Sequence, residues 1–328
     1  MSTPPQQPQP PPRPPGSRTP LSIGVVGAGR LGAVLGAALA RVGHPVTAVS
    51  GRSAASRARI ARLLPDTPLR RPDQVAAGVD LLILAVPDDA LGPLVADLAG
   101  SGALRAEQIV AHLSGAHGLA VLQPATALGA RPLAIHPAMT FAGTPADVDL
   151  LTGGITFGVT APASLAPVVE RLVGDLGGRV EWIAEEYRPL YHAALVAGAN
   201  HLVTLVNEAA DRLRDAGAVH PEELLRPLLA ASLDNALRLG DAALTGPVAR
   251  GDARTVAGHL AALRATAPGS VPAYVVLARR TADRAIAAGA LPPVDAEPLL
   301  RVLAAEPAEL RGPAELRGPA EPVGSAAG

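Results

Sequence analysis

The 328-residue sequence contains no cysteine and no lysine, so that all 28 basic residues are arginine. Without cysteine there is no disulfide, no thiolate nucleophile and no Cys-ligated zinc site. Without lysine there is no Schiff base and no catalytic ammonium group. Any proton transfer must therefore use other side chains, histidine above all.

Excess charge and long apolar runs are also missing. The formal net charge is −1, which argues against nucleic-acid binding, because affinity for phosphate backbones needs clustered Arg and Lys in excess. Apolar stretches break well before the roughly 18 residues of a membrane span. Residues 1–19 are rich in Pro and Gln, unlike a secretory signal peptide. We expect a cytoplasmic protein with a small-molecule partner and no membrane or nucleic-acid contact.

A glycine-rich turn stands out in what is present, in the stretch S-I-G-V-V-G-A-G-R-L-G at residues 22–32. An apolar strand precedes it and a helical pattern follows, as in dinucleotide-binding folds. Gly27 permits the tight turn, Gly29 lets the backbone approach a pyrophosphate, and Gly32 lets the helix pack on the strand. The helix start, with Arg30 and Leu31, then offers free N–H groups to phosphates.

The next strand ends at Arg52 and Ser53, where a dinucleotide fold meets the adenosine ribose. An acidic residue there would favour NAD, whereas Arg with Ser favours the 2′-phosphate of NADP(H). A plain surface role for Arg52 is the alternative, and we expect Arg59 on a solvated helix face. A buried apolar strand then ends at Val86 and Pro87, which we expect beside the cofactor because ligands bind at the carboxyl ends of parallel strands.

Two further strand-like stretches, 109–117 and 131–141, carry histidines. His112, Ser114 and His136 fall at strand ends on the expected cofactor side, although a hydrogen-bonded structural role is the alternative for each. Neither histidine has a carboxylate at ligand spacing, so we expect no metal site.

From Tyr187 onward the apolar period is helical. A helix over about 187–215 places His192, Asn200 and Asn207 within an arc of about 80° on a face shared with apolar residues. Buried polar groups need partners, which a substrate or neighbouring helices can supply. More helices are expected over about 221–239, 253–265 and 271–289. Arg250, in the loop before the second of these, is a candidate for pairing with a carboxylate.

Seven motifs occur in order over about residues 20–290: G-A-G-R-L-G, S-G-R-S, A-V-P-D, H-L-S-G-A, H-P-A-M-T-F, Y-H-A-A and T-G-P-V-A-R-G-D. They resemble Rossmann-like proteins that carry a C-terminal domain of unknown function 2520. Such proteins are similar in architecture to phosphogluconate dehydrogenase, pyrroline-carboxylate reductase and ketopantoate reductase. The resemblance implies an α/β, doubly wound Rossmann nucleotide-binding domain, followed by an all-helical, phosphogluconate-dehydrogenase-like domain that commonly dimerises.

The resemblance also implies an NADP-linked reductase with catalytic residues on the first long helix. Phosphogluconate dehydrogenase and ketopantoate reductase place a Lys and an Asn there. Asn200 can stand for the Asn, but Val196 occupies the position four residues before it. We therefore expect His192 to donate the proton and Asn200 to position the substrate oxygen, with His136 and Ser114 closing the site.

These inferences give a domain plan and a function. We expect a disordered arm at 1–19, an NADP-binding domain at 20–184, a helical substrate and dimerisation domain at 185–304, and a disordered tail at 305–328. The expected protein is a homodimeric NADP-dependent oxidoreductase that transfers a hydride to a small carboxylate-bearing carbonyl or imine compound. Ketopantoate reduction is the best guess, with imine reduction and hydroxy-acid oxidation still open. A non-catalytic NADP-binding sensor or scaffold is the alternative.

Overall fold

The computed structural model of this chain describes residues 20–304. The two segments expected to be disordered, 1–19 and 305–328, lie outside the described residues. The described chain divides into two compact units, the first ending at Asn200 and the second beginning at His201. This division falls within one long helix, whereas the sequence placed the domain boundary at residue 184.

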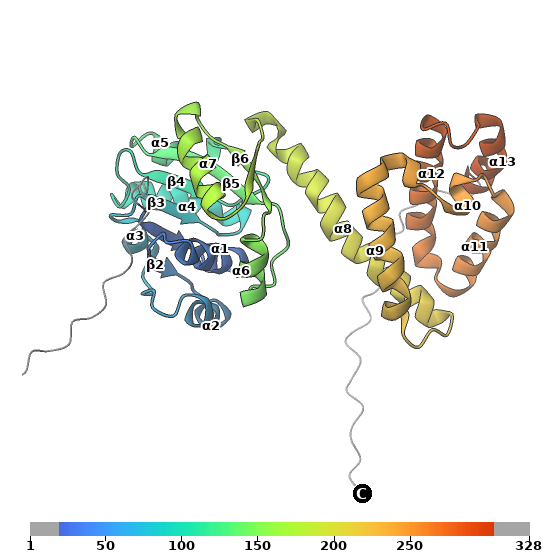
Figure 1. Cartoon of the computed structure of the whole chain (residues 1–328), viewed down its shortest axis with the longest axis horizontal. Helices are drawn as coiled ribbons and strands as arrows, with labels where there is room; N and C mark the ends of the chain where they lie inside the picture. Colours follow the sequence, from blue (N-terminus) through green and yellow to red (C-terminus); the bar gives the residue numbers. More distant parts are fainter. Residues whose placement is uncertain (1–19, 305–328) are drawn as a thin grey trace, which may run out of the picture. The chain divides into compact units, whose positions relative to one another are not determined.

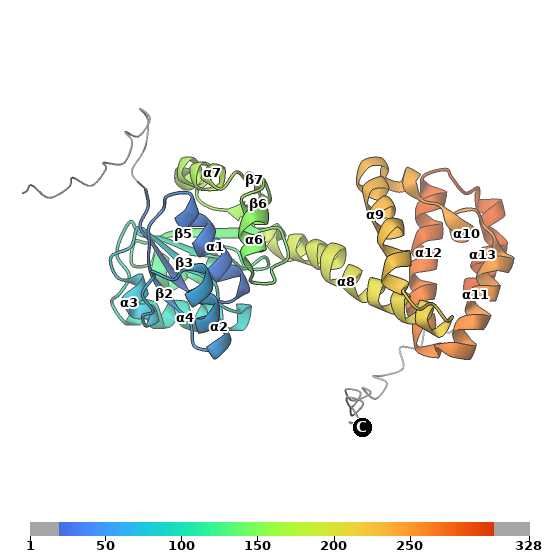
Figure 2. The ribbon, with the colours of Figure 1, turned by 60° about the horizontal axis from the view of Figure 1, so that its bottom comes forward.

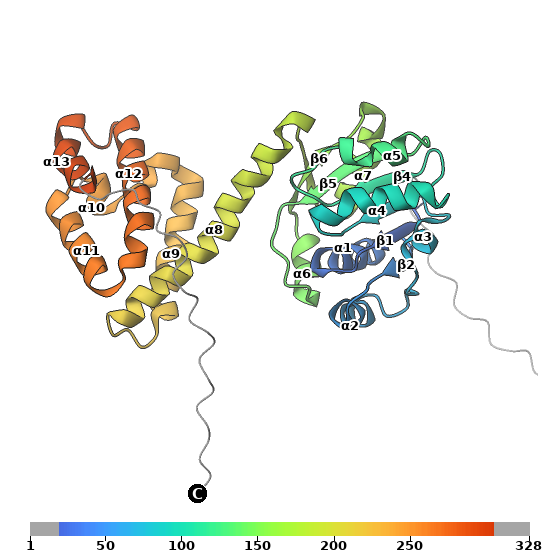
Figure 3. The same cartoon turned by 180° about the vertical axis from the view of Figure 1, so that it is seen from behind.

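The first unit alternates strands and helices, in line with the strand-turn-helix pattern at residues 22–32 and the apolar strands expected after it. Its strands are β1 (Ile23–Val26), β2 (Val46–Ser50), β3 (Leu81–Leu84), β4 (Ile109–His112), β5 (Arg131–Pro137), β6 (Thr156–Thr160) and β7 (Arg179–Trp182). Its helices include α1 (Arg30–Arg41), α2 (Ala54–Leu63), α3 (Pro72–Ala76), α4 (Asp88–Gly100), α5 (Gln123–Thr126), α6 (Pro145–Leu151) and α7 (Ala166–Asp175). Helix α1 packs beside α6, and α4 packs beside α5 (Figure 1 and Figure 3).

The seven strands form one sheet in the order β2-β1-β3-β4-β5-β6-β7. Strands β1 to β5 run parallel to one another, β6 is antiparallel to β5, and β7 is parallel to β6. The expected Rossmann-like α/β fold is thus confirmed, with a direction reversal at β6 that the alternating sequence pattern did not reveal. The reversal sets Gly158 opposite His136 in the register of β5 and β6.

The core of this unit lies on both faces of the sheet. Within β3, Leu81 and Ile83 join one buried cluster, while Leu82 and Leu84 join the other. Successive side chains of a strand point to opposite faces, so a strand that is apolar throughout needs cover on both sides. This arrangement leaves the carboxyl ends of the parallel strands as the edge available for a ligand.

The helical part begins with α8 (Arg188–Asp215), which crosses the division between the units. It continues with α9 (Pro221–Leu239), α10 (Gly246–Ala249), α11 (Ala253–Thr266), α12 (Val271–Ala287) and α13 (Pro293–Ala304), of which α13 has no counterpart among the expected helices. Helices α11 and α12 both pack against α13 (Figure 2). Their buried residues, such as Val256, Val275 and Leu299, form the core of the second unit. Among residues 20–304, no helix is long and apolar enough to cross a membrane.

Candidate functional site

The glycine-rich turn between β1 and α1 has the geometry that its sequence predicts. Gly27 has a φ of +97°, and a Cβ there would collide with the carbonyl oxygen of Ala85. A Cβ on Gly32 would collide with the carbonyl oxygen of Gly27. The fold itself therefore requires glycine at these two positions.

Gly29 differs, because the only neighbouring protein atom that its Cβ would meet is the Ala85 oxygen, 4.0 Å away. The protein leaves this space free beside the start of α1, where backbone N–H groups attract anions. The space that a Cβ would take is what a pyrophosphate needs for close approach. The turn therefore fits a dinucleotide.

Two neighbours hold this turn in place. The Gly27 N–H donates to the Ser50 hydroxyl over 3.2 Å, and the Ala28 N–H donates to the Ser50 carbonyl over 2.7 Å. Arg59 also reaches the turn, where its guanidinium donates to the Ala28 carbonyl over 3.1 Å. Arg59, expected on a solvated helix face, is half-buried because α2 places its guanidinium against the turn.

A cavity of about 680 Å³ opens beside the turn. It is lined by Val26, Gly27, Ser50, Gly51, Arg52, Leu69, Arg70, Arg71, Pro72, Gln74, Val86, Ala90 and Leu94. Three of these side chains are arginines and none is acidic. Such a lining suits a ligand with an apolar ring and negative charge.

The sequence-predicted residues near this cavity have different surroundings. Arg52 and Val86 line it. Pro87 directly precedes α4. The Ser53 hydroxyl caps α2 by accepting from the Ser56 N–H over 3.0 Å, and it also donates to the Ser56 hydroxyl. This capping role engages Ser53 without any ligand.

A second polar group lies where β4 and β5 end and α8 begins. The Nδ1 atom of His136 is 3.0 Å from the Tyr191 hydroxyl. The ring of His192 is edge-on to that of His136, with centroids 6.1 Å apart, and it packs against Gly115. The structure thus brings His136 and His192 together, and it adds Tyr191, to which the sequence analysis assigned no role.

Arg188 lies next to this cluster and is fully buried. Its guanidinium donates to the carbonyl oxygens of Ser114, His117 and Gly158 over 2.6, 3.0 and 3.1 Å. It also lies 5.5 Å from the centre of the Tyr191 ring. Burial lowers the pKa of Arg188 from its usual value. The site therefore has a buried positive charge beside it, whose hydrogen-bond partners are neutral carbonyl groups.

The two strand-end histidines are neutral at physiological pH. Burial lowers the pKa of His112 to about 4, and burial with the nearby Arg188 charge lowers that of His136 to about 4. The Nδ1 atom of His112 accepts from the Ser114 N–H, so that Nε2 donates to the Gly118 carbonyl over 2.8 Å. His112 is thus fully engaged within the protein, in line with the structural alternative.

Other predicted residues lie outside this cluster. The Ser114 hydroxyl accepts from the N–H groups of Ala116 and His117, which orders the turn after β4. Asn200 is exposed and lies eight residues after His192, about 12 Å along the axis of α8. Arg250 belongs to the second unit, directly after α10. Among residues 20–304, no group of His, Cys, Asp or Glu side chains is arranged to hold a metal ion.

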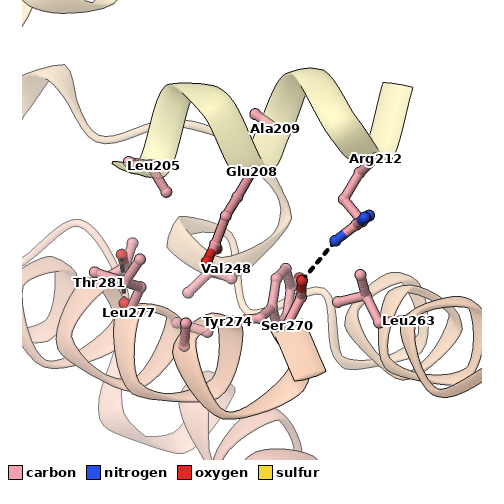
Figure 4. Close-up of a pocket in the computed structure, with 12 residues that line it drawn as sticks. Leu205, Glu208, Ala209, Arg212, Val248, Leu263, Ser270, Tyr274, Leu277 and Thr281 are labelled. Carbon is pink, nitrogen blue, oxygen red and sulfur yellow. Dashed lines mark hydrogen bonds between the residues drawn. The ribbon is translucent and has the colours of Figure 1, made fainter. Parts of the chain in front are cut away.

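The second unit has a cavity of its own, of about 310 Å³, between the end of α8 and α12. Apolar side chains such as Leu205, Leu263 and Leu277 form most of its wall (Figure 4). Arg212 on its rim donates to the Ser270 hydroxyl over 2.8 Å and also pairs with Asp215. Its mostly apolar lining contrasts with the three arginines of the cavity beside the glycine-rich turn.

Comparison with known proteins agrees with this geometry. Residues 8–137 match the Rossmann-like domain, the class that the glycine turn and parallel strands define. Residues 155–281 match the domain of unknown function 2520. The chain therefore carries a Rossmann-like domain followed by domain of unknown function 2520, which confirms the resemblance seen in its motifs. No curated protein matches the chain.

Several solved structures share the fold. A candidate NADP oxidoreductase from Bacteroides fragilis is 23% identical, with a TM-score of 0.68 over 80% of this chain and 98% of that one. Plasmodium falciparum pyrroline carboxylate reductase with NADP bound is 12% identical, with a TM-score of 0.53 over 85% and 98%. A reductive aminase from Aspergillus terreus in complex with NADPH is 21% identical, with a TM-score of 0.54 over 77% and 87%. At these identities the likeness shows the fold.

Proposed function

We propose that this protein is an NADP-dependent oxidoreductase acting on a small carbonyl or imine compound that bears a carboxylate. The observation that carries the proposal is the open space at Gly29 beside a cavity lined by arginine and by no acid. The fold shared with NADP-binding reductases supports it. The histidine cluster lies where β4 and β5 end, at the same sheet edge as the turn.

The nucleotide would be held by the turn at Gly27 to Gly32, by the N-terminus of α1 with Arg30 and Leu31, and by Arg52. Val86 contributes an apolar wall. When bound, NADPH supplies a hydride. The chain itself must then supply a proton and must stabilise the negative charge that develops on the substrate oxygen or nitrogen.

We assign the proton to His192. This side chain is partly exposed, and it makes no hydrogen bond within the part of the chain that the structure describes. His136 and Tyr191 bond to each other, so they act as a positioning pair. A protonated His192 gives its proton to the substrate atom that gains negative charge, and solvent returns a proton to its ring. Asn200, about 12 Å along α8 from His192, remains our candidate for holding a substrate oxygen other than the atom that takes the proton.

The charge of the site favours an anionic substrate. Arg188 contributes a buried positive charge whose three hydrogen bonds all go to neutral carbonyl oxygens. A carboxylate on the substrate would lower the cost of that charge through their mutual attraction.

We also propose that the protein works as a homodimer. Exposed leucines occur along α9, including Leu224, Leu228 and Leu237, which are 57%, 61% and 82% exposed. The preceding helix α8 exposes Leu202 and Val203 as well. A second copy is a natural cover for such apolar surface in a soluble chain.

The absence of lysine favours one competing function, a non-catalytic NADP-binding sensor. The two functions separate in one experiment, in which the purified protein and NADPH are mixed with a panel of 2-oxo acids and cyclic imines. We expect NADPH absorbance to fall with at least one carboxylate-bearing compound. Tight NADPH binding without oxidation by any member of the panel would instead favour the sensor.

A further inference from the structure

A short extended segment adds a further edge to the sheet beside β2. The Val49 N–H donates to the Pro68 carbonyl over 3.1 Å, and the Arg70 N–H donates to the Val49 carbonyl over 2.9 Å. These bonds make a parallel bridge between Val49 and Leu69. The backbone of Arg70 is therefore fixed next to the end of β2. This strand ends at Ser50, two residues before Arg52.

Arg52 and Arg70 consequently line one cavity from two separate chain segments. Both residues are exposed. The Arg70 guanidinium donates only to its neighbouring Leu69 carbonyl, over 3.3 Å, among the bonds of residues 20–304. The Arg52 side chain makes no hydrogen bond or ion pair in that range. No acidic side chain lines the cavity to balance these two charges.

Arg71 lines the same cavity but has a partner. Its guanidinium donates to both carboxylate oxygens of Asp73, over 3.2 and 2.7 Å. This two-point pairing is the favoured geometry for arginine and a carboxylate. Arg71 is therefore already neutralised, whereas its neighbour Arg70 is not.

We propose that Arg70 is a second determinant of selectivity for NADP(H), binding the 2′-phosphate together with Arg52. Two unpaired cations at one cavity repel each other, and a phosphate dianion between them turns that repulsion into attraction. Guanidinium forks match phosphate oxygens in geometry. The inference rests on the proposed function, since it requires the cavity to hold the adenosine end of the cofactor.

Arg70 has one competing role at this position, which is stacking on the adenine ring through its flat guanidinium. Stacking would strengthen NADPH and NADH equally, because both carry adenine. Phosphate binding would strengthen NADPH alone. The pair 2′,5′-ADP and 5′-AMP makes the same distinction with small probes, since the two differ only by the 2′-phosphate.

The test is calorimetric titration of the full chain and its variants with NADPH, NADH, 2′,5′-ADP and 5′-AMP. Charge-assisted hydrogen bonds predict that Arg70→Ala weakens NADPH and 2′,5′-ADP by about tenfold or more. Its binding of NADH and 5′-AMP should not change. Arg70→Lys should recover part of the loss, because an ammonium restores the charge. Arg71→Ala is the matched control and should change NADPH affinity by less than about twofold, because Asp73 already occupies that guanidinium.

Each other outcome overturns a definite statement. Equal losses for NADPH and NADH in Arg70→Ala would assign Arg70 to the adenine and would overturn our inference, while the cofactor proposal would stand. A loss in Arg71→Ala as large as in Arg70→Ala would show that NADPH affinity depends on the total positive charge of the cavity. That result would overturn the specific role of Arg70. A wild-type protein that binds neither NADPH nor 2′,5′-ADP would overturn the proposed function and the role of Arg70 with it.

Discussion

The two units of this chain differ in how completely their apolar side chains are buried. In the first, both faces of the sheet are covered, and side chains such as Leu82 and Phe157 are completely buried. In the second, α11 to α13 share a core, while α9 buries only Pro221 and Leu225 and leaves most of its leucines exposed. The first unit, our proposed nucleotide unit, is thus a complete fold within one chain. The helical unit leaves apolar surface exposed, which a second copy would cover in the proposed dimer.

The largest difference between the two units should be in how strongly acid lowers their stability. The pKa of His112 and that of His136 are about 4 in the folded chain, against 6.5 for an ordinary histidine. Between these values the unfolded chain binds more protons than the folded one, so stability rises with pH and is lost as pH falls from 6.5 to 4. We expect a loss of about 3 kcal/mol for each histidine as an upper estimate.

The only tryptophan of the chain, Trp182, lies in β7, so its fluorescence in urea titrations reports on the nucleotide unit. A folded His112→Gln variant should lose part of the pH dependence of its unfolding midpoint. His220→Gln, at an exposed position in the other unit, serves as the control. The same pH dependence in both variants would mean that the buried histidines do not cause it.

The next largest effect tests chemistry in the nucleotide unit. Replacing His192 by Ala should lower turnover by about a hundredfold, within the usual range for a general acid, and should leave NADPH affinity intact. His201→Ala on the same helix is the matched control, since His201 is exposed at the start of the second unit. Unchanged turnover in His192→Ala would remove His192 from the mechanism and make Tyr191 the next residue to replace.

Cofactor choice should show a smaller change. Arg52→Ala should weaken NADPH binding by about tenfold, because one charge-assisted contact with the 2′-phosphate is lost. NADH affinity should stay the same, as measured by titration of intrinsic fluorescence. If both cofactors lose affinity to the same extent, Arg52 does not discriminate between them.

The helical unit should give the smallest change in monomer stability. Leu237 is 82% exposed, so Leu237→Ala should alter the unfolding free energy of an isolated monomer by less than about 0.5 kcal/mol. Leu228→Glu with Leu237→Glu should instead shift the mass measured by light scattering from dimer toward monomer. A wild-type protein that is already monomeric at micromolar concentration would contradict the proposed dimer.

Sequence reasoning succeeded where function depends on local pattern. The requirement for glycine at Gly27 and Gly32 follows from one strand-turn-helix segment, and the structure shows the collisions that enforce it. The bounds expected for the helix over about 221–239 agree with those of α9, Pro221–Leu239. Each of these features is decided by residues a few positions apart.

Contacts between segments far apart in the sequence could not be predicted. Tyr191 reaches His136 because β6 runs antiparallel to β5, which sets the bare backbone of Gly158 beside that histidine and leaves room for the tyrosine ring. Arg70 joins the cavity only through the bridge between Leu69 and Val49. Neither the strand reversal nor this bridge has a signature within its own segment. Their residues could be found only once the sheet was assembled.

The buried Arg188 also constrains the order in which the chain folds. Its guanidinium joins α8 to carbonyls of residues 71 and 74 positions earlier, and to Gly158 in β6. These bonds can form only after β4 and β6 have reached their places, since loop closure over such separations precedes the contacts that it allows. We therefore expect the first turn of α8 to dock late in folding. The histidine cluster that depends on it would then be among the last parts of the nucleotide unit to form.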